Sequence, residues 1–248
     1  MISAPRSFLG LSFTQLPREA ALAEVAAQAA RLASFRYVAT PNVAHVVALH
    51  DDLASRKPLY DAAWLRLNDS RILELLARAS GLALPVATGS DLTADLFEKA
   101  IRPDTPITVI GGDAALIAEL KRRYGLATVY WHAPPMGLAR NPEAIAEAAA
   151  FIAAHKAAFV FVCVGSPQQE MLAKAVQDRG GAVGVGLCVG ASLEFLVGRI
   201  ERAPRWMQAA RLEWLHRLAS EPKRLARRYL IEGPKIVAIW SRWRQEAA

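Results

Sequence analysis

The chain has 248 residues, of which 53% are hydrophobic and 21% are charged, and its formal net charge is +7. This composition excludes disordered, collagen-like and low-complexity proteins, and the length suffices for one large α/β domain or two small ones with a full core. The only cysteines, Cys163 and Cys188, lie inside apolar runs. That usage excludes a disulfide scaffold and a cysteine-rich zinc module, and it predicts two buried thiols.

Short apolar runs alternate with amphipathic stretches through residues 1–190. The runs are mostly rich in valine, isoleucine or aromatic residues, which is typical of buried parallel strands. We predict strands at Phe35–Ala39, Ile107–Ile110, Ala127–Trp131, Phe159–Val164 and Ala182–Val189, and a weaker one at Trp64–Leu67. We predict helices at Pro17–Leu32, Val43–Arg56, Ile72–Ala79, Leu92–Ile101, Ala114–Tyr124, Pro142–His155 and Gln168–Arg179. This alternation predicts βαβ units, and hence an α/β fold with a Rossmann-like, doubly wound parallel sheet.

Three of the predicted helices are preceded by capping signals. Ser90-Asp91 and Gly112-Asp113 supply side chains that can accept a hydrogen bond from a first-turn amide. Asn141-Pro142 combines such a cap with a proline at the first helical position.

The last fifth of the chain has a different character. From Arg199 onward there are twelve basic and five acidic residues, so this segment carries the whole net charge and residues 1–198 are neutral. Strand patterns disappear, and two helical patterns follow at Pro204–Ala219 and Pro222–Arg244, the second ended or kinked by Gly233-Pro234. We therefore predict a core over residues 1–198 and a helical appendage over residues 199–248.

The appendage also interleaves arginine with four of the six tryptophans, which are Trp206, Trp214, Trp240 and Trp243. Arginine and tryptophan together suit an anionic membrane surface, because both side chains settle at the headgroup boundary. Nucleic acid is the competing partner, and a solvated helix pair with a few core aromatics is the plainest alternative. We favour the membrane surface and expect no nucleic-acid partner. With neither a run of about 20 apolar residues nor a secretory leader pattern, we expect a cytoplasmic protein.

Polar clusters follow the predicted strands at equivalent positions. They are Thr40-Pro41-Asn42, Asn68-Asp69-Ser70, Gly111-Gly112-Asp113, the run from Gly165 to Glu170, and the run from Gly190 to Glu194. Ligands of open parallel sheets bind beyond the carboxyl ends of the strands, so these clusters predict a shared cleft. Each cluster taken alone also has a structural explanation, with Asp69 and Asp113 as helix caps and the glycines as tight turns.

Several common site motifs are absent from the sequence. Gly184, Gly186 and Gly190 are spaced one residue too widely for a dinucleotide fingerprint, and Gly111-Gly112 is not followed by a Walker lysine. The five histidines show no metal-binding spacing, so we predict neither a metal site nor a cofactor.

The run from Cys188 to Leu230 carries a distinctive order of motifs. They are Val189-Gly190, Glu194, Gly198, Arg202-Ala203-Pro204, Glu213-Trp214-Leu215, Arg217-Leu218, Glu221-Pro222, Arg224 and Arg228-Tyr229. In this order they resemble the C-terminal signature of the bacterial WecG/TagA/CpsF glycosyltransferases. Thr40-Pro41-Asn42, Gly111-Gly112 and the Gly165 to Glu170 run match as well, so the resemblance covers roughly residues 8–230.

The resemblance implies an inverting, metal-independent glycosyltransferase without a cofactor. Such an enzyme moves a sugar from a UDP-sugar donor to a polyprenyl-pyrophosphate-linked sugar acceptor, as a peripheral protein on the cytoplasmic face of the inner membrane. The family's proposed base corresponds to Asp69, and Thr40 and Asn42 correspond to residues that shape the sugar site. Arginines of the appendage that close over a pyrophosphate correspond to Arg217, Arg224 and Arg227. The remaining substrate-binding positions implied are Gly111, Gly112, Gln169, Glu170, Gly190 and Glu194.

The chemistry of such a transfer is consistent with these residue types. One base must take the proton of the acceptor hydroxyl, and positive charge must stabilise the departing UDP. Arginine can supply that charge because it binds phosphate bidentately and does not lose its proton. Two rival classes remain: a non-catalytic protein that binds a nucleotide or anionic lipid, and a nucleotide-dependent oxidoreductase, which the missing fingerprint disfavours.

Overall fold

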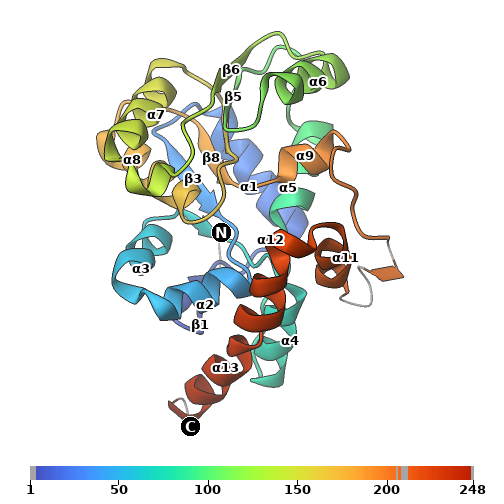
Figure 1. Cartoon of the computed structure of the whole chain (residues 1–248). Coiled ribbons are helices and arrows are strands. Elements are labelled where there is room, and N and C mark those ends of the chain that lie inside the picture. The colour runs from blue at the N-terminus through green and yellow to red at the C-terminus, as the bar shows by residue number, and fades with distance from the viewer. Residues whose placement is uncertain (1–3, 205, 208–211, 247–248) are drawn as a thin grey trace.

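The computed structural model describes residues 4–204, 206–207 and 212–246. Its centre is a six-stranded parallel sheet with the strand order β4-β3-β8-β7-β5-β6 (Figure 1). The strands are β3 (Arg36–Ala39), β4 (Leu65–Arg66), β5 (Ile107–Ile110), β6 (Val129–His132), β7 (Phe159–Val162) and β8 (Val185–Cys188). The predicted α/β fold with a Rossmann-like parallel sheet is therefore confirmed.

Helices cover both faces of this sheet, and each face has its own hydrophobic core. Val160 and Val162 of β7 face one core, whereas Phe159 and Phe161 face the other, because successive residues of a strand point in opposite directions. The helices of the core are α1 (Arg18–Ala30), α2 (Val43–Asp51), α3 (Leu53–Asp61), α4 (Arg71–Ala79), α5 (Gly89–Lys99), α6 (Ala114–Tyr124), η1 (Leu138–Arg140), α7 (Pro142–Ala154), α8 (Gln168–Arg179) and α9 (Ser192–Leu196). Residues of α1, α5, α6 and α9 line one core, and residues of α2, α3, α4, α7 and α8 line the other.

A short antiparallel hairpin precedes the sheet and was not predicted. Its strands are β1 (Arg6–Phe8) and β2 (Leu11–Phe13), joined by Leu9 and Gly10, which both have positive φ. A two-residue turn of this kind matches the twist of paired strands. The strands are only three residues long, so they are too short to show a recognisable alternation of polar and apolar residues.

Two predicted helices differ from the observed ones at their starts or in their continuity. The helix predicted over Val43–Arg56 is broken at Asp52, whose side chain accepts a hydrogen bond from the Ser55 amide and begins α3. Helix α5 begins at Gly89 because Thr88, and not Ser90-Asp91, caps it. The caps predicted at Asp113 and Asn141 are confirmed, since each accepts a hydrogen bond from an amide of the first turn.

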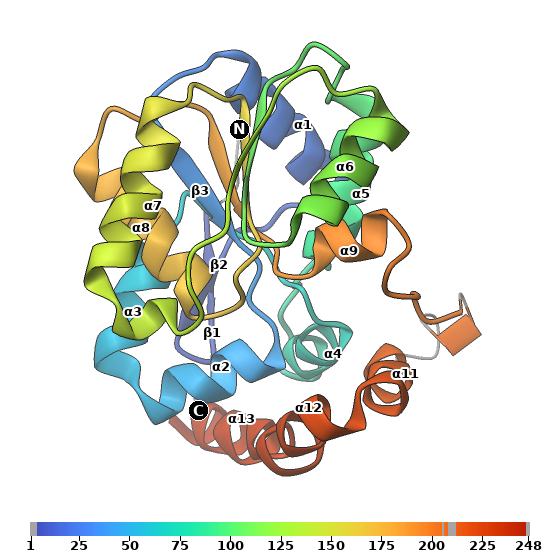
Figure 2. The ribbon, with the colours of Figure 1, turned by 45° about the horizontal axis from the view of Figure 1, so that its top comes forward.

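The appendage forms an arc of helices beneath α2 and α4 (Figure 2). Its described helices are α11 (Glu213–Ser220), α12 (Pro222–Ala226), the π-helical η2 (Arg227–Glu232) and α13 (Lys235–Glu246). The single helix predicted over Pro222–Arg244 is thus divided, with Gly233-Pro234 between η2 and α13. Residues 205 and 208–211 of the first predicted helix lie outside the described part of the chain.

Two tryptophans that we expected at lipid headgroups pack against the core instead. The Trp243 ring meets Phe8 edge-on, with ring centroids 5.1 Å apart, and Trp240 Nε1 donates a hydrogen bond to Ser80 Oγ at 2.9 Å. Ile236 and Ile239 of the same helix are buried in the core that contains the hairpin. Helix α13 is therefore part of the folded body, and the expectation for these two tryptophans is wrong.

Candidate functional site

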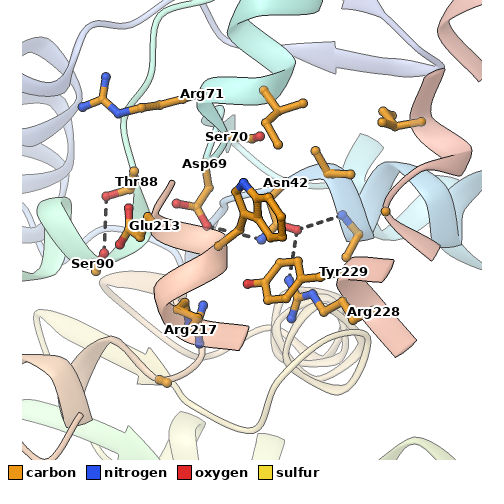
Figure 3. A pocket seen from close by; sticks show the side chains of 18 of the residues that line it. Asn42, Asp69, Ser70, Arg71, Thr88, Ser90, Glu213, Arg217, Arg228 and Tyr229 are labelled. Carbon is orange, nitrogen blue, oxygen red and sulfur yellow. Dashed lines mark hydrogen bonds between the residues drawn. The ribbon is translucent and has the colours of Figure 1, made fainter. Parts of the chain in front are cut away.

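A cavity of about 490 Å³ lies where the loops after β3, β4 and β8 meet the appendage. This volume is within the usual range for small-molecule sites. Figure 3 shows Asp69 and Asn42 together at its centre, Glu213 beside Thr88 and Ser90, and Tyr229 beside Arg228. Residues between 213 and 237 form one wall of the cavity, over the carboxyl ends of these strands.

Asp69 lies in the loop between β4 and α4, and its neighbours in sequence hold it there. The Asn68 side chain accepts a hydrogen bond from the Ser70 amide, and Ser70 Oγ accepts one from the Leu73 amide and so caps α4. Because Ser70 is the cap, the alternative of Asp69 as a helix cap is wrong, and its carboxylate is available to the cavity.

The surroundings of Asp69 change its acidity. Burial raises the pKa of its carboxyl group to about 7, against a hydrogen bond from Asn42 that lowers it. The charge of Glu213 raises the pKa further, and that of Arg217 lowers it. A carboxylate with a pKa near neutrality is suited to general base catalysis.

Asn42 is held so that its amide nitrogen faces Asp69. Its Nδ2 donates to Asp69 Oδ2 at 3.4 Å, while its Oδ1 accepts from the Ala44 amide at 3.1 Å and from Arg228 at 3.2 Å. Its own amide donates to His45 Nδ1 at 3.0 Å, which completes a capping box at the start of α2. Burial lowers the pKa of His45 to about 3, so the ring is neutral and can accept that bond.

Thr40 lies behind the cavity wall. It is buried, and its Oγ1 donates to the Cys188 carbonyl at 3.0 Å. A Cβ on Gly89 would be 3.1 Å from this oxygen, so the glycine allows α5 to approach closely. Thr40 thus supports the wall at Gly89 and does not itself line the cavity.

The glutamine and glutamate of the predicted cleft form a buried pair. Gln169 Oε1 accepts from the Gly190 amide at 3.0 Å, and Gln169 Nε2 donates to Glu170 Oε1 at 2.8 Å. Burial raises the pKa of Glu170. Their observed contacts hold the loop after β8 and do not reach the cavity.

Four other predicted positions, Gly111, Gly112, Gly190 and Glu194, also lie outside the cavity lining. Gly111 and Gly112 follow β5, which β7 and β8 separate from β3, and both have positive φ. Glu194 lies in α9, and its carbonyl accepts from the Arg199 amide at 2.9 Å.

The three predicted arginines have different positions. Arg217 lines the cavity, with its guanidinium 5.3 Å from the centre of the Phe195 ring. Arg227 is exposed and pairs with Glu232 at 3.0 Å, outside the cavity lining. The side chain of Arg224 lies outside the described part of the structure.

Several lining residues were not predicted from the sequence to belong to the site. They are Arg71, Thr88, Ser90, Glu213, Trp214, Arg228 and Tyr229. Glu213-Trp214 and Arg228-Tyr229 belong to the C-terminal signature described above, and membership in that signature is the sequence feature that could have identified them as site residues. The cavity also receives the N-termini of α2, α4 and α5, whose partial positive charge favours an anion.

Neither a metal-ligand cluster nor a membrane span occurs among the described residues. No group of three or more His, Cys, Asp or Glu side chains in this part of the chain is arranged to hold a metal ion. Nor does any described helix have the length and apolar character needed to cross a membrane.

A comparison with protein families matches residues 6–248 to the glycosyl transferase WecG/TagA/CpsF family. The match covers nearly the whole chain, and the chain belongs to this family. It is therefore a member of a glycosyltransferase family of bacterial polysaccharide biosynthesis.

Proposed function

We propose that the protein transfers a sugar, with inversion, from a UDP-sugar to a polyprenyl-pyrophosphate-linked sugar acceptor. The observation that carries this proposal is Asp69 in a cavity that also contains Arg217 and Arg228. The Asp69 carboxylate takes the proton of the acceptor hydroxyl, whose oxygen bonds to the anomeric carbon of the donor. The bond from that carbon to the UDP oxygen breaks, and UDP leaves with the electron pair.

The cations of the cavity can stabilise the charge that develops on UDP. Arginine guanidinium groups and helix N-termini bind phosphate without a metal ion. We therefore propose a metal-independent reaction in which Arg217 is one of these cations, and Arg224 and Arg227 of the same appendage remain the other arginines that the resemblance implies.

We further propose that the appendage binds the cytoplasmic face of the inner membrane. It carries the net positive charge of the chain, and it exposes apolar side chains. The most exposed of these are Trp206, Leu230, Ile231 and Val237. Positive charge and exposed apolar side chains together favour an anionic membrane surface.

The test is UDP release by the full-length protein with a panel of UDP-sugars and a short-chain prenyl-pyrophosphate-linked sugar. We expect acceptor-dependent UDP release that persists in EDTA. Binding of UDP-sugars without acceptor-dependent release would instead identify a binding protein that retains the cavity. Loss of activity in EDTA would contradict the metal-independent mechanism.

A further inference from the structure

Helix α4 of the core lies beside helix α13 of the appendage (Figure 1). Near their starts, Ile72 of α4 and Ile236 of α13 line the same cavity. Further along, Trp240 of α13 donates its hydrogen bond to Ser80, directly after the end of α4. The two helices therefore run side by side, and both begin at the cavity.

Helix α4 presents basic and apolar side chains to solvent on one face. Arg71, Leu75 and Arg78 are four and three residues apart, so they share that face, and the buried Leu73 and Ala77 lie on the opposite one. The first three are exposed, and 43% of Leu75 is accessible to solvent. In the described part of the chain, neither arginine is within ion-pair distance of an acidic side chain. We call Arg71, Leu75 and Arg78 the α4 stripe.

The α4 stripe adjoins the exposed surface of the appendage. Of the described residues that line the cavity, only Arg71, Pro234 and Val237 are exposed. Arg71 is the first residue of α4, and the other two lie in or directly before the first turn of α13. The stripe and the apolar surface at Val237 therefore meet on the exposed side of the cavity.

The other flank of α13 has the opposite charge. There Lys235 pairs with Asp51 at 3.4 Å, at the end of α2, and the adjoining Asp52 is exposed as well. In α4 the one acidic residue, Glu74, is half-buried, so two arginines and one glutamate leave this helix with a net charge of +1. An anionic surface attracts arginine and repels carboxylates, so the charges favour α4 over α2 as the continuation of the proposed membrane surface.

We infer that the α4 stripe is a second membrane contact, which belongs to the core and binds an anionic lipid surface together with the exposed residues of the appendage. This inference rests on the membrane binding in the proposed function. Arginine stems and leucine suit the headgroup boundary, where charge and apolar surface are both accommodated. Contact through an element of the core as well as the appendage orients the core relative to the bilayer.

The test measures cosedimentation of the full-length protein with vesicles of phosphatidylglycerol and phosphatidylcholine in equal parts. Leu75→Ser combined with Arg78→Ser changes two residues that do not line the cavity. We expect the partition coefficient to fall at least roughly fivefold, because an arginine near an anionic leaflet and a leucine buried in it both favour binding. Arg31→Ser combined with Leu32→Ser is the matched control. This exposed pair lies between α1 and the start of β3, at the edge of the sheet away from the appendage.

A second variant adds charge to the α4 stripe. Ala79 is exposed and follows Leu75 by four residues, and lysine suits this position near the helix C-terminus. We expect Ala79→Lys to bind the same vesicles roughly two- to fivefold more tightly. Ala33→Lys, at an exposed position beside Leu32, is the matched control and should give no comparable gain.

Wild-type binding by the Leu75 and Arg78 double variant, or an equal loss in its control, would overturn the inference. Thermal unfolding without vesicles shows whether that variant is folded, and if it is not, the result for Ala79→Lys decides. A loss in the α4 variant, with unchanged binding when Leu230 and Ile231 are both replaced by serine, would contradict only the proposed contact of the appendage. The reverse result would contradict only this inference, and a wild type that does not bind these vesicles would contradict both.

Discussion

Asp69 lies among groups that act on its carboxylate in opposite directions. Burial and Glu213 favour the protonated form, whereas Asn42 and Arg217 favour the ionised form. The resulting pKa of about 7 allows the residue to exchange a proton near neutral pH.

Asp69→Asn should abolish most of the turnover. The amide keeps the size of the side chain and can accept the Asn42 hydrogen bond, but it cannot take a proton. We expect acceptor-dependent UDP release to fall by about 10²–10⁴-fold while UDP-sugar binding is retained. Asp61→Asn, at an exposed carboxylate outside the cavity, is the control. Turnover near the wild-type rate would show that Asp69 is not the base.

The same substitution should stabilise the protein at alkaline pH. The pKa of Asp69 is higher in the folded state than in the unfolded state. The contribution of Asp69 to the free energy of unfolding is therefore fully present below about pH 4 and is lost as the pH rises through about 7. At pH 8 the wild-type protein has an ionised carboxylate in this site, whereas the variant has a neutral amide there. Because Asp69 is half-buried and solvent screens part of the effect, we expect a gain in the free energy of unfolding of about 1 kcal/mol, or roughly 2–4 °C in Tm. The gain should shrink at pH 5, and an unchanged Tm at pH 8 would contradict it.

Glu213→Gln should move the pH dependence of the reaction. The base must be ionised, so kcat/KM should rise with pH through about 7. Removing the negative charge of Glu213 lowers the pKa of Asp69, and the acidic limb should therefore shift to lower pH. Glu201→Gln, outside the cavity lining, should leave that limb in place. An unmoved limb in Glu213→Gln would show that the two carboxylates do not interact.

At the scale of elements, two ion pairs tie the start of the appendage to the core helices. Arg199 contacts both oxygens of Asp113 at 2.9 Å, at the start of α6. Arg202 donates to Asp91 Oδ1 at 2.8 Å, in the first turn of α5. Burial alone would raise the pKa of Asp91, but the hydrogen bond and charge of Arg202 hold it below its usual value.

A double-mutant cycle should measure the strength of the ion pair between Arg202 and Asp91. We expect Arg202→Ala and Asp91→Ala to show a coupling free energy on the order of 1 kcal/mol in denaturant unfolding, because both side chains are partly buried. The exposed pair Lys57–Asp61 is the comparison, with an expected coupling below about 0.5 kcal/mol. Equal coupling free energies in the two pairs would mean that the Arg202–Asp91 pair holds the appendage to α5 no more strongly than an exposed surface pair would.

At the scale of the whole molecule, the proposed membrane surface can be separated from the active site. Leu230→Ser combined with Ile231→Ser should weaken binding to anionic liposomes while turnover of a soluble acceptor is retained, since neither residue lines the cavity. Wild-type binding should also weaken as salt rises beyond about 0.15 M. Leu53→Ser, at an exposed position on α3, is the control. Unchanged liposome binding in the double variant would assign membrane contact to another surface.

The sequence by itself determined the alternation of strands and helices, because the period of apolar residues is a local property of the chain. It also placed Asn42 and Asp69 after two strands that follow one another in the chain, and a parallel sheet brings the carboxyl ends of its strands to one edge. Only the tertiary structure decided which side chains meet there. Arg228 reaches Asn42 across 186 positions of sequence, and Trp243 packs on Phe8 because α13 folds back on the hairpin. Contacts over such distances depend on how the elements pack together, and no local pattern encodes them.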